Sequence, residues 1–210
     1  MKSLVERFHG GSVHPGRIRC LAEALTPLIN AGSRVLDVGC GDGMLAGAIA
    51  ERRGDISIRG ADVLVRGGGG ILVDPLDGDR LPYAQDAFDT VMLVDVIHHA
   101  EDPLMLLAEA TRVSSDVIII KDHLLEGIFA SATLRFMDWV GNARHGVNLP
   151  YNYWTRAQWD DALDALKLTP MAWQSELGLY PVWARPLVER DLHFIAKLCV
   201  PDRHGSVEVA

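Results

Sequence analysis

The feature that most constrains the fold is a nine-residue segment in which an apolar run leads directly into alternating glycines, Val35-Leu36-Asp37-Val38-Gly39-Cys40-Gly41-Asp42-Gly43. The apolar run predicts a buried strand. The glycines predict a tight turn, because residues without a Cβ accept positive φ and let a ligand approach the backbone. We expect a helix to follow, from Met44 to about Arg53, with its first N–H groups pointing at the ligand. The segment therefore predicts a strand–turn–helix unit that binds a ligand at the turn.

The spacing of this turn narrows the class of ligand. A dinucleotide-binding fingerprint would place a third glycine at position 44, where this chain has methionine. A phosphate-binding loop would end in Gly-Lys-Ser or Gly-Lys-Thr, and the segment contains no lysine. Asp37 lies two positions before Gly39 and favours a cationic or hydrogen-bond-donating group over a phosphate. The turn therefore predicts a nucleoside-bearing cofactor without phosphates.

An acidic residue, one spacer and glycines at alternate positions resemble the first motif of the class I S-adenosylmethionine-dependent methyltransferases. The resemblance is to their small-molecule branch, the ubiquinone/menaquinone-type or methyltransferase type 11-like enzymes, and it covers roughly residues 33 to 122. Further segments extend it in the family's order, and they are Ile56–Asp62, Ile71–Asp74, Asp77–Tyr83 and Ala87–His99. The resemblance implies that S-adenosylmethionine is the cofactor and S-adenosylhomocysteine the product.

The resemblance also implies roles for single residues around this cofactor. Asp62 would accept from both ribose hydroxyls, Asp77 from the exocyclic amine of adenine, and the Gly78 N–H would donate to a ring nitrogen. We expect Cys40, inside the turn, to fill space rather than to act as a nucleophile. The cofactor-binding residues implied are Asp37, Gly39, Cys40, Gly41, Gly43, Asp62, Val63, Asp77, Gly78, Asp95 and Val96.

Strands alternate with helices along the chain, which is typical of an α/β fold with a parallel sheet. Predicted strands lie at about 34–38, 56–62, 71–73, 90–95, 116–121, 171–175 and 193–199, and predicted helices at 15–29, 44–53, 103–113 and 155–167. The apolar runs Val91–Val94 and Val117–Ile120 suit strands that are covered on both faces. We therefore expect a Rossmann-like, doubly wound, seven-stranded and mostly parallel sheet with an antiparallel last strand.

One long connection interrupts this pattern. Residues 124–153 are too long for an ordinary connection and too apolar for a solvated loop. We interpret them as a helical lid over the substrate, inserted into a single domain that spans 1–210. The alternative is that their aromatic side chains are ordinary core packing for the last helix.

Methyl transfer from a sulfonium is a direct displacement, so the enzyme mainly aligns the reacting groups. An acceptor that must lose a proton also needs a base, and histidine is the usual choice. The candidates are His98, His99, His123 and His145. We favour His123, which stands with Asp122 just beyond the fifth predicted strand, and we keep His99 as a second catalytic candidate. In the family the His-His pair often shapes the substrate side.

Charge and composition narrow the partners. The formal net charge is −8 and no basic run occurs, which argues against nucleic acid and favours a small-molecule acceptor. No stretch has the pattern of a signal peptide or a membrane span, so we expect a cytoplasmic protein. Three cysteines without paired spacing argue against a disulfide framework. The sequence leaves open whether the protein forms a homodimer.

Two other functions fit the same motifs. A metal-assisted O-methyltransferase would hold Mg²⁺ with Asp95, Asp122 and His123 at neighbouring strand ends. The Asp-Asp-Asn pattern of such enzymes is incomplete here, so we expect no resident metal. A non-catalytic module that binds the methyl donor or its product to regulate a partner would carry the same glycine turn. It would differ in lacking an open acceptor cavity.

Overall fold

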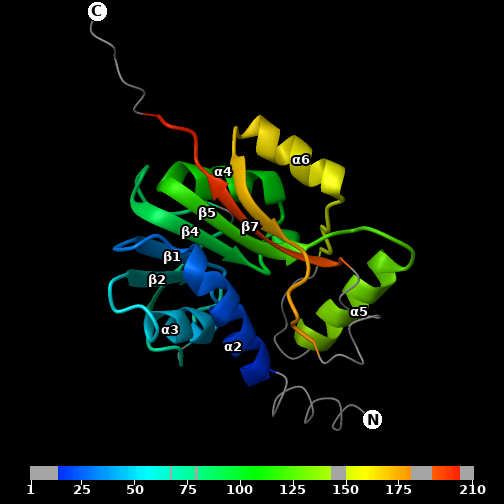
Figure 1. Ribbon diagram of the computed structural model, residues 1–210, viewed down its shortest axis with the longest axis horizontal. Helices are drawn as coiled ribbons and strands as arrows, with labels where there is room; N and C mark the ends of the chain where they lie inside the picture. The colour runs from blue at the N-terminus through cyan, green and yellow to red at the C-terminus, as the bar shows by residue number, and fades with distance from the viewer. Residues whose placement is uncertain (1–13, 67, 79, 143–149, 181–190, 204–210) are drawn as a thin grey trace, which may run out of the picture.

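The computed structural model describes residues 14–66, 68–78, 80–142, 150–180 and 191–203. Its sheet has seven strands in the order β3-β2-β1-β4-β5-β7-β6, so β4 is the central strand and lies between β1 and β5 (Figure 1). Strand β7 runs antiparallel to both neighbours, and all other pairings are parallel. The predicted sheet and its antiparallel last strand are confirmed. The strands are β1 (Arg34–Val38), β2 (Ser57–Asp62), β3 (Leu72–Pro75), β4 (Phe88–Val94), β5 (Ser114–His123), β6 (Thr169–Gln174) and β7 (His193–Cys199).

Helices cover both faces of the sheet (Figure 1). Helices α2 (His14–Leu25) and α3 (Met44–Ala50) pack on one face, and α4 (Pro103–Val113) and α6 (Arg156–Ala165) pack on the other. Short 3₁₀ helices follow α2 (η2, Thr26–Leu28) and β4 (η3, Ile97–His99), and α5 (Ala130–Asn142) lies beyond the carboxyl end of β5. None of the helices in the described ranges is long and apolar enough to cross a membrane.

Alternation along the strands divides the core into two layers. On β1, Val35 packs with α2 and α3, whereas Leu36 packs with α4 and α6. Neighbouring side chains of a strand point to opposite faces, so a strand covered on both sides is apolar throughout. The sheet edge with the glycine turn and the histidines is the carboxyl end of its parallel strands, where ligands bind in open α/β sheets.

Helix boundaries follow local signals. Asp102 caps α4 by accepting from the Met105 N–H at 3.0 Å, and Thr155 and Gln158 form the predicted capping box of α6. Three helices are shorter than predicted, and α6 ends at Ala165, two residues before the expected end. α2 ends at Leu25 and tightens into η2, because Pro27 lacks an N–H. α3 ends at Ala50, three residues early, and continues as turns.

A glycine crossing lies beside the β1 turn. The loop after β2 passes over the first turn of α3, so that an added Cβ on Gly47 would lie 2.0 Å from the Gly69 carbonyl oxygen. An added Cβ on Gly69 would likewise lie 2.0 Å from the Gly43 backbone. Glycine at these positions is therefore a packing requirement, and it lets a short loop join two parallel strands without an intervening helix.

We expect Gly47→Ala to reduce the free energy of unfolding by about 1–3 kcal/mol, because the new methyl overlaps backbone that cannot move independently. Alanine normally stabilises a helix interior by roughly 0.5–1 kcal/mol relative to glycine. Gly16→Ala in α2 is the matched control, since an added Cβ there meets nothing within 4 Å. Urea unfolding measures both variants. A stabilised Gly47→Ala protein would contradict the crossing.

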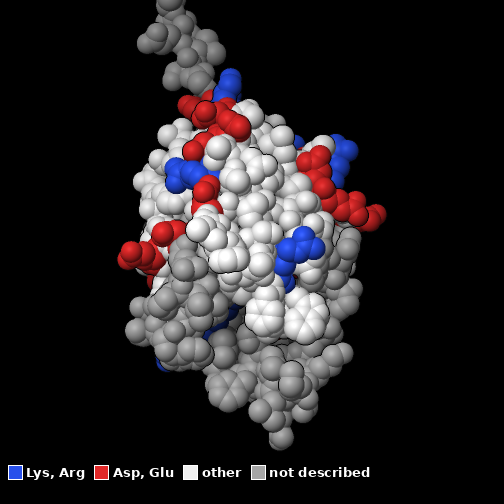
Figure 2. Space-filling view, turned by 90° about the vertical axis from the view of Figure 1, so that its right-hand side faces the viewer, with Lys and Arg blue, Asp and Glu red and all other residues white. Residues whose placement is uncertain are grey.

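The predicted lid contains one described helix, α5. Its inner side packs through Ala130 and Leu134 against Tyr153 and Leu192. Figure 2 views this side of the molecule and shows a largely uncharged surface below the charged residues. Helix α5 and the residues just before it expose large apolar side chains, namely Ile128, Phe129, Phe136 and Trp139. These exposed side chains are not core packing. The aromatic residues at the end of the segment differ, because Tyr153 is buried and Trp154 packs on Trp159 of α6 with ring centroids 4.9 Å apart. The alternative of core packing for the last helix is therefore confirmed for Trp154.

Candidate active site

The glycine turn after β1 has the predicted left-handed backbone. Gly39, Gly41 and Gly43 have φ of 70°, 62° and 73°. An added Cβ on Gly39 would lie 2.3 Å from the Val96 Cγ2, and the Gly39 N–H donates to the Ala61 carbonyl at 2.7 Å. The turn is thus held against β2 on one side and against the residue after β4 on the other.

Two carboxylates lie beside this turn without a cationic partner. Asp62 accepts from the Gly41 N–H at 2.7 Å and from the Leu64 N–H at 2.8 Å. Asp37 is 2% exposed, and burial together with the charge of Asp62 raises its pKa to about 7. No Lys, Arg or His among the described residues forms an ion pair with either acid. The turn therefore presents two carboxyl groups to a ligand, and a cationic ligand would favour the ionised form of Asp37.

The other predicted cofactor residues lie further out. Val63 and Asp77 are exposed, and the backbone of Asp77 forms an isolated antiparallel β-bridge with that of Arg80. Gly78 has φ of 71° and open space around it. Burial and the nearby charge of Asp37 raise the pKa of the Cys40 thiol to about 12. Cys40 therefore stays protonated at neutral pH, as expected for a residue that fills space rather than one that attacks a substrate.

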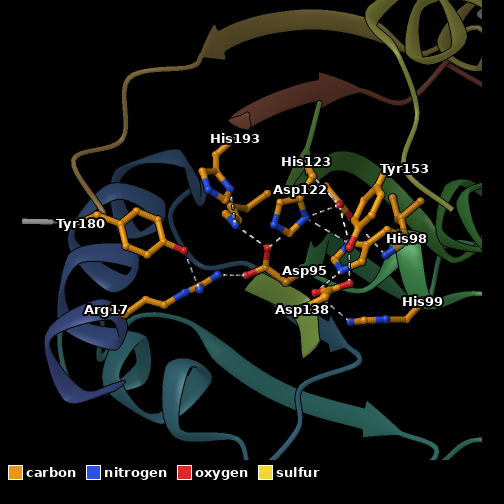
Figure 3. A network of polar contacts seen from close by, with 12 residues as sticks. Arg17, Asp95, His98, His99, Asp122, His123, Asp138, Tyr153, Tyr180 and His193 are labelled. Carbon is orange, nitrogen blue, oxygen red and sulfur yellow. Dashed lines mark hydrogen bonds and ion pairs between the residues drawn. The ribbon is translucent and has the colours of Figure 1, made fainter. Parts of the chain in front are cut away.

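Asp95, the residue after β4, is the centre of a buried charge cluster (Figure 3). Its carboxylate accepts from Arg17 Nη2 of α2 at 2.5 Å and pairs with Lys121 Nζ of β5. The Lys121 side chain is 0% exposed. Burial lowers the pKa of Lys121, while the two cations hold the pKa of Asp95 well below its usual value despite burial. Arg17 also donates to the Tyr180 hydroxyl at 3.3 Å.

A second cluster surrounds Asp122 at the end of β5. Its Oδ1 lies 2.6 Å from His98 Nδ1, 3.2 Å from His123 Nδ1 and 2.7 Å from the His123 backbone N–H. Its other oxygen accepts from the Ile97 N–H. The imidazolium of His98 and these donors keep the carboxylate ionised despite burial, with a pKa well below the usual range. His98, as an imidazolium, donates from Nδ1 to this oxygen, and His123 Nδ1 lies 3.3 Å from His98 Nδ1 as well as near Asp122.

The two histidines of this cluster differ in charge. Burial opposes a charge on His98, but Asp122 and Asp138 outweigh it and raise its pKa to about 10. Burial, Lys121 and His98 together lower the pKa of His123 to about 4. At neutral pH His123 is thus an uncharged imidazole.

Helix α5 reaches this cluster through Asp138. The Asp138 carboxylate accepts from the Tyr153 hydroxyl at 2.5 Å, and its other oxygen lies 3.4 Å from His98 Nε2 and 3.9 Å from His99 Nε2 (Figure 3). Burial lowers the pKa of His99. Residues from β4, β5, η3 and α5 thus meet at one edge of the sheet.

The structure brings most of the predicted residues together and adds others. One polar network contains Asp95, His98, His99, Asp122 and His123. His145 lies outside the described residues. Asp122 and His98 are buried beneath the site rather than lining it. The sequence analysis missed Lys121, Tyr153 and Asp138. Lys121 follows three isoleucines of a buried strand, and this position indicates a buried ammonium. A buried ammonium requires a counter-charge, so the sequence could have predicted an acidic partner for it.

The Mg²⁺ alternative does not fit the observed pairing. Asp95 is already neutralised by Arg17 and Lys121, and it lies 3.9 Å from His123 Nδ1. Asp122 is saturated by nitrogen donors. An oxygen-rich site built from Asp95, Asp122 and His123 would have to break both clusters.

Comparison with known proteins agrees with this architecture. A family model described as methionine biosynthesis protein MetW matches residues 19–158. The methyltransferase GfsG of Streptomyces halstedii is 28% identical over 141 residues, which cover 54% of this chain and 50% of that protein. The 27-O-demethylrifamycin SV methyltransferase of Amycolatopsis mediterranei (strain S699) is 29% identical over 140 residues, covering 52% and 50%.

The chain therefore spans about half the length of the curated relatives it matches. Among solved structures, a SAM-dependent methyltransferase from Aquifex aeolicus superposes with a TM-score of 0.59 at 15% identity, and the match covers 96% of this chain and 99% of that one. At this identity the structural likeness establishes the fold.

Proposed function

The chain belongs to the MetW family and has the class I S-adenosylmethionine-dependent methyltransferase fold, and on this premise we propose that it transfers a methyl group from S-adenosylmethionine to a small-molecule acceptor. The observation that supports this most is the pair of carboxylates, Asp37 and Asp62, beside the left-handed glycine turn, neither of which has a cationic partner among the described residues. A cationic nucleoside with free ribose hydroxyls compensates that charge, whereas a phosphate would be repelled by it.

Each part of the turn suits such a ligand. Asp62 is oriented by the Gly41 and Leu64 N–H groups, so its carboxylate is preorganised to accept from ribose hydroxyls. Asp37 supplies the negative potential, and Asp77 with Gly78 occupies the position proposed for adenine. We propose that the walls of the cofactor site are formed by Gly39, Cys40, Gly41, Gly43, Val63 and Val96. When bound, S-adenosylmethionine supplies an electrophilic methyl group on a sulfonium.

The acceptor side is proposed to lie between Asp95, the histidines and α5. In this proposal Asp122 accepts from His123 Nδ1, which leaves Nε2 as the basic atom. This arrangement, in which a buried carboxylate orients an imidazole, suits proton removal from an acceptor hydroxyl or acidic carbon. His99, on the partly open side of η3, is proposed to contact the acceptor. The net charge of −8 favours a small molecule over nucleic acid.

The direct test is a screen of metabolite extracts with S-adenosylmethionine that carries a labelled methyl group, followed by identification of the labelled product. A labelled small molecule that appears only with the active protein supports the proposal. A protein that binds S-adenosylmethionine but labels nothing across several extracts would indicate the non-catalytic module instead.

We expect Asp62→Ala to weaken S-adenosylmethionine binding by about 1–3 kcal/mol, or roughly 5- to 150-fold in Kd, because charge-assisted hydrogen bonds are lost. Calorimetric titration measures this. Asp160→Ala is the matched control, since Asp160 is an exposed carboxylate on α6 that pairs only with Arg156 among the described residues. Equal affinity of wild type and Asp62→Ala would remove Asp62 from the proposed site.

A further inference from the structure

Three potential metal ligands converge where helix α5 meets the strand ends. They are His98 and His99 of η3 and Asp138 of α5, and their ligand atoms all lie within 4.8 Å of one another. Figure 3 shows the two imidazole rings and the Asp138 carboxylate turned toward one another. Residues from two separate segments thus offer two nitrogens and one oxygen to the same small volume.

The hydrogen bonding of this group is incomplete. Nε2 of His98, which faces Asp138, is buried and has no hydrogen-bond partner among the described residues. Nδ1 of His99 also has none, but it is not the ring nitrogen of His99 that faces Asp138. The separation of 3.4 Å between His98 Nε2 and Asp138 Oδ1 is longer than a good N–H···O hydrogen bond. Unpartnered buried polar atoms in a native structure require an explanation, and an ion is one such explanation.

The distances suit a tetrahedral ion. Ligand atoms about 2.0–2.2 Å from a tetrahedral metal lie roughly 3.3–3.6 Å apart, which includes the spacing between His98 Nε2 and Asp138 Oδ1. His99 Nε2 lies 3.9 Å from the same oxygen. The His99 side chain is 18% exposed, so it has room for the small rotation that closes this gap.

The atoms behind these ligands are arranged as in metal sites. A ligating histidine almost always donates its other ring N–H to a carboxylate. His98 does this, because its Nδ1 lies 2.6 Å from Asp122 Oδ1. The Asp138 oxygen that does not face the imidazoles accepts from the Tyr153 hydroxyl. These contacts orient the ligands before any ion is present.

We propose that His98, His99 and Asp138 bind a divalent transition-metal ion of the zinc type. The ion replaces the Nε2 proton of the His98 imidazolium, which is released to solvent. Two imidazoles and one carboxylate favour such an ion over Mg²⁺, which prefers oxygen ligands. The inference departs from our sequence-based expectation of no resident metal. Because Asp138 belongs to α5, the bound ion ties this helix to the end of β4.

A neighbouring triad, His98, Asp122 and His123, is also close enough to hold an ion. There the two Nδ1 atoms and the His123 backbone nitrogen already lie within hydrogen-bond distance of one Asp122 oxygen. An ion at that oxygen would have to displace these three contacts. The site with unpartnered atoms is the one that includes Asp138.

The test is a titration of the full chain, stripped with a chelator and without a methyl donor, with Zn²⁺ by calorimetry and with Co²⁺ by visible absorption. It is therefore independent of the proposed function. We expect one ion per chain and the intense absorption of tetrahedral Co²⁺. His99→Ala and Asp138→Asn should each weaken Zn²⁺ binding at least 10-fold, whereas the control His123→Gln should stay within about 3-fold.

Circular dichroism and thermal unfolding of the metal-free variants establish that each one folds. His99→Ala changes a partly exposed side chain and Asp138→Asn keeps the shape of the residue, so at least one folded variant is expected. The proposal is overturned if the wild-type chain binds no stoichiometric Zn²⁺, if either folded ligand variant binds it as tightly as wild type, or if His123→Gln loses binding equally.

Discussion

Replacing Asp95 with alanine is expected to lower the free energy of unfolding at pH 7 by about 3 kcal/mol. The substitution leaves the ammonium of Lys121, which is fully buried, without its counter-charge. Removing one partner of a buried ion pair costs about 3–5 kcal/mol, because the remaining charge stays desolvated. Arg17 loses the same acceptor, which adds to the loss.

The pH dependence of this loss has a definite sign. Burial places the pKa of Lys121 below its value of 10.5 in the unfolded chain, and removing Asp95 lowers it further. At pH values between the folded-state and the unfolded-state pKa of Lys121, the unfolded chain binds more protons than the folded chain. The free energy of unfolding therefore rises with pH in this range. The deficit of Asp95→Ala relative to wild type should therefore shrink as the pH is raised from 7 toward 10.

Urea unfolding at several pH values measures both effects. Asp89→Ala is the matched control, because Asp89 pairs with Arg34 at the exposed surface and such pairs contribute about 0–1 kcal/mol. The double variant Asp95→Ala/Lys121→Met should recover to within about 1 kcal/mol of wild type at pH 7. A double variant as unstable as Asp95→Ala would show that Lys121 is not the cause.

Replacing His123 with alanine is expected to reduce turnover about 10²- to 10⁴-fold, the usual contribution of a positioned general base. The affinity for S-adenosylmethionine should stay within about 2-fold, because His123 lies at the end of β5, away from the glycine turn after β1. Single-turnover rates with the acceptor identified by the labelling screen, together with calorimetry, separate the two quantities.

Asp122→Asn is the companion to this variant. The amide keeps only one accepting oxygen and no negative charge, so it cannot satisfy both the Ile97 N–H and the imidazoles, and His123 is held less firmly. We expect a smaller but clear loss of turnover, with donor affinity again unchanged. If His123→Ala turned over as fast as wild type, another group would have to take the proton.

The sequence predicted elements with local causes. The residues Val35–Gly43 contain both the apolar run and the glycines that force the backbone to turn, so the β1 turn follows from a nine-residue window. The caps of α4 and α6 also depend on residues three positions apart. Strand order has no such local signal, because it depends on which strands pair across the sheet.

The site was harder to predict because its contacts join distant segments. Asp95 meets Arg17 across 78 residues and Lys121 across 26. Motif spacing located Asp95, but it did not indicate which cations neutralise it. Asp138 lies in the predicted lid, and nothing in its surroundings along the chain marks it as the residue that reaches His98 and Tyr153.

By itself the sequence determined the alternation of strands and helices, the glycine turn and its acidic neighbours, because periodicity, missing Cβ atoms and caps act within a few residues. Only the tertiary structure decided which charges are paired and which polar atoms stay unpartnered. Burial makes each buried charge depend on whichever side chain the fold brings within about 3 Å, and that neighbour is set by strand order rather than by spacing along the chain.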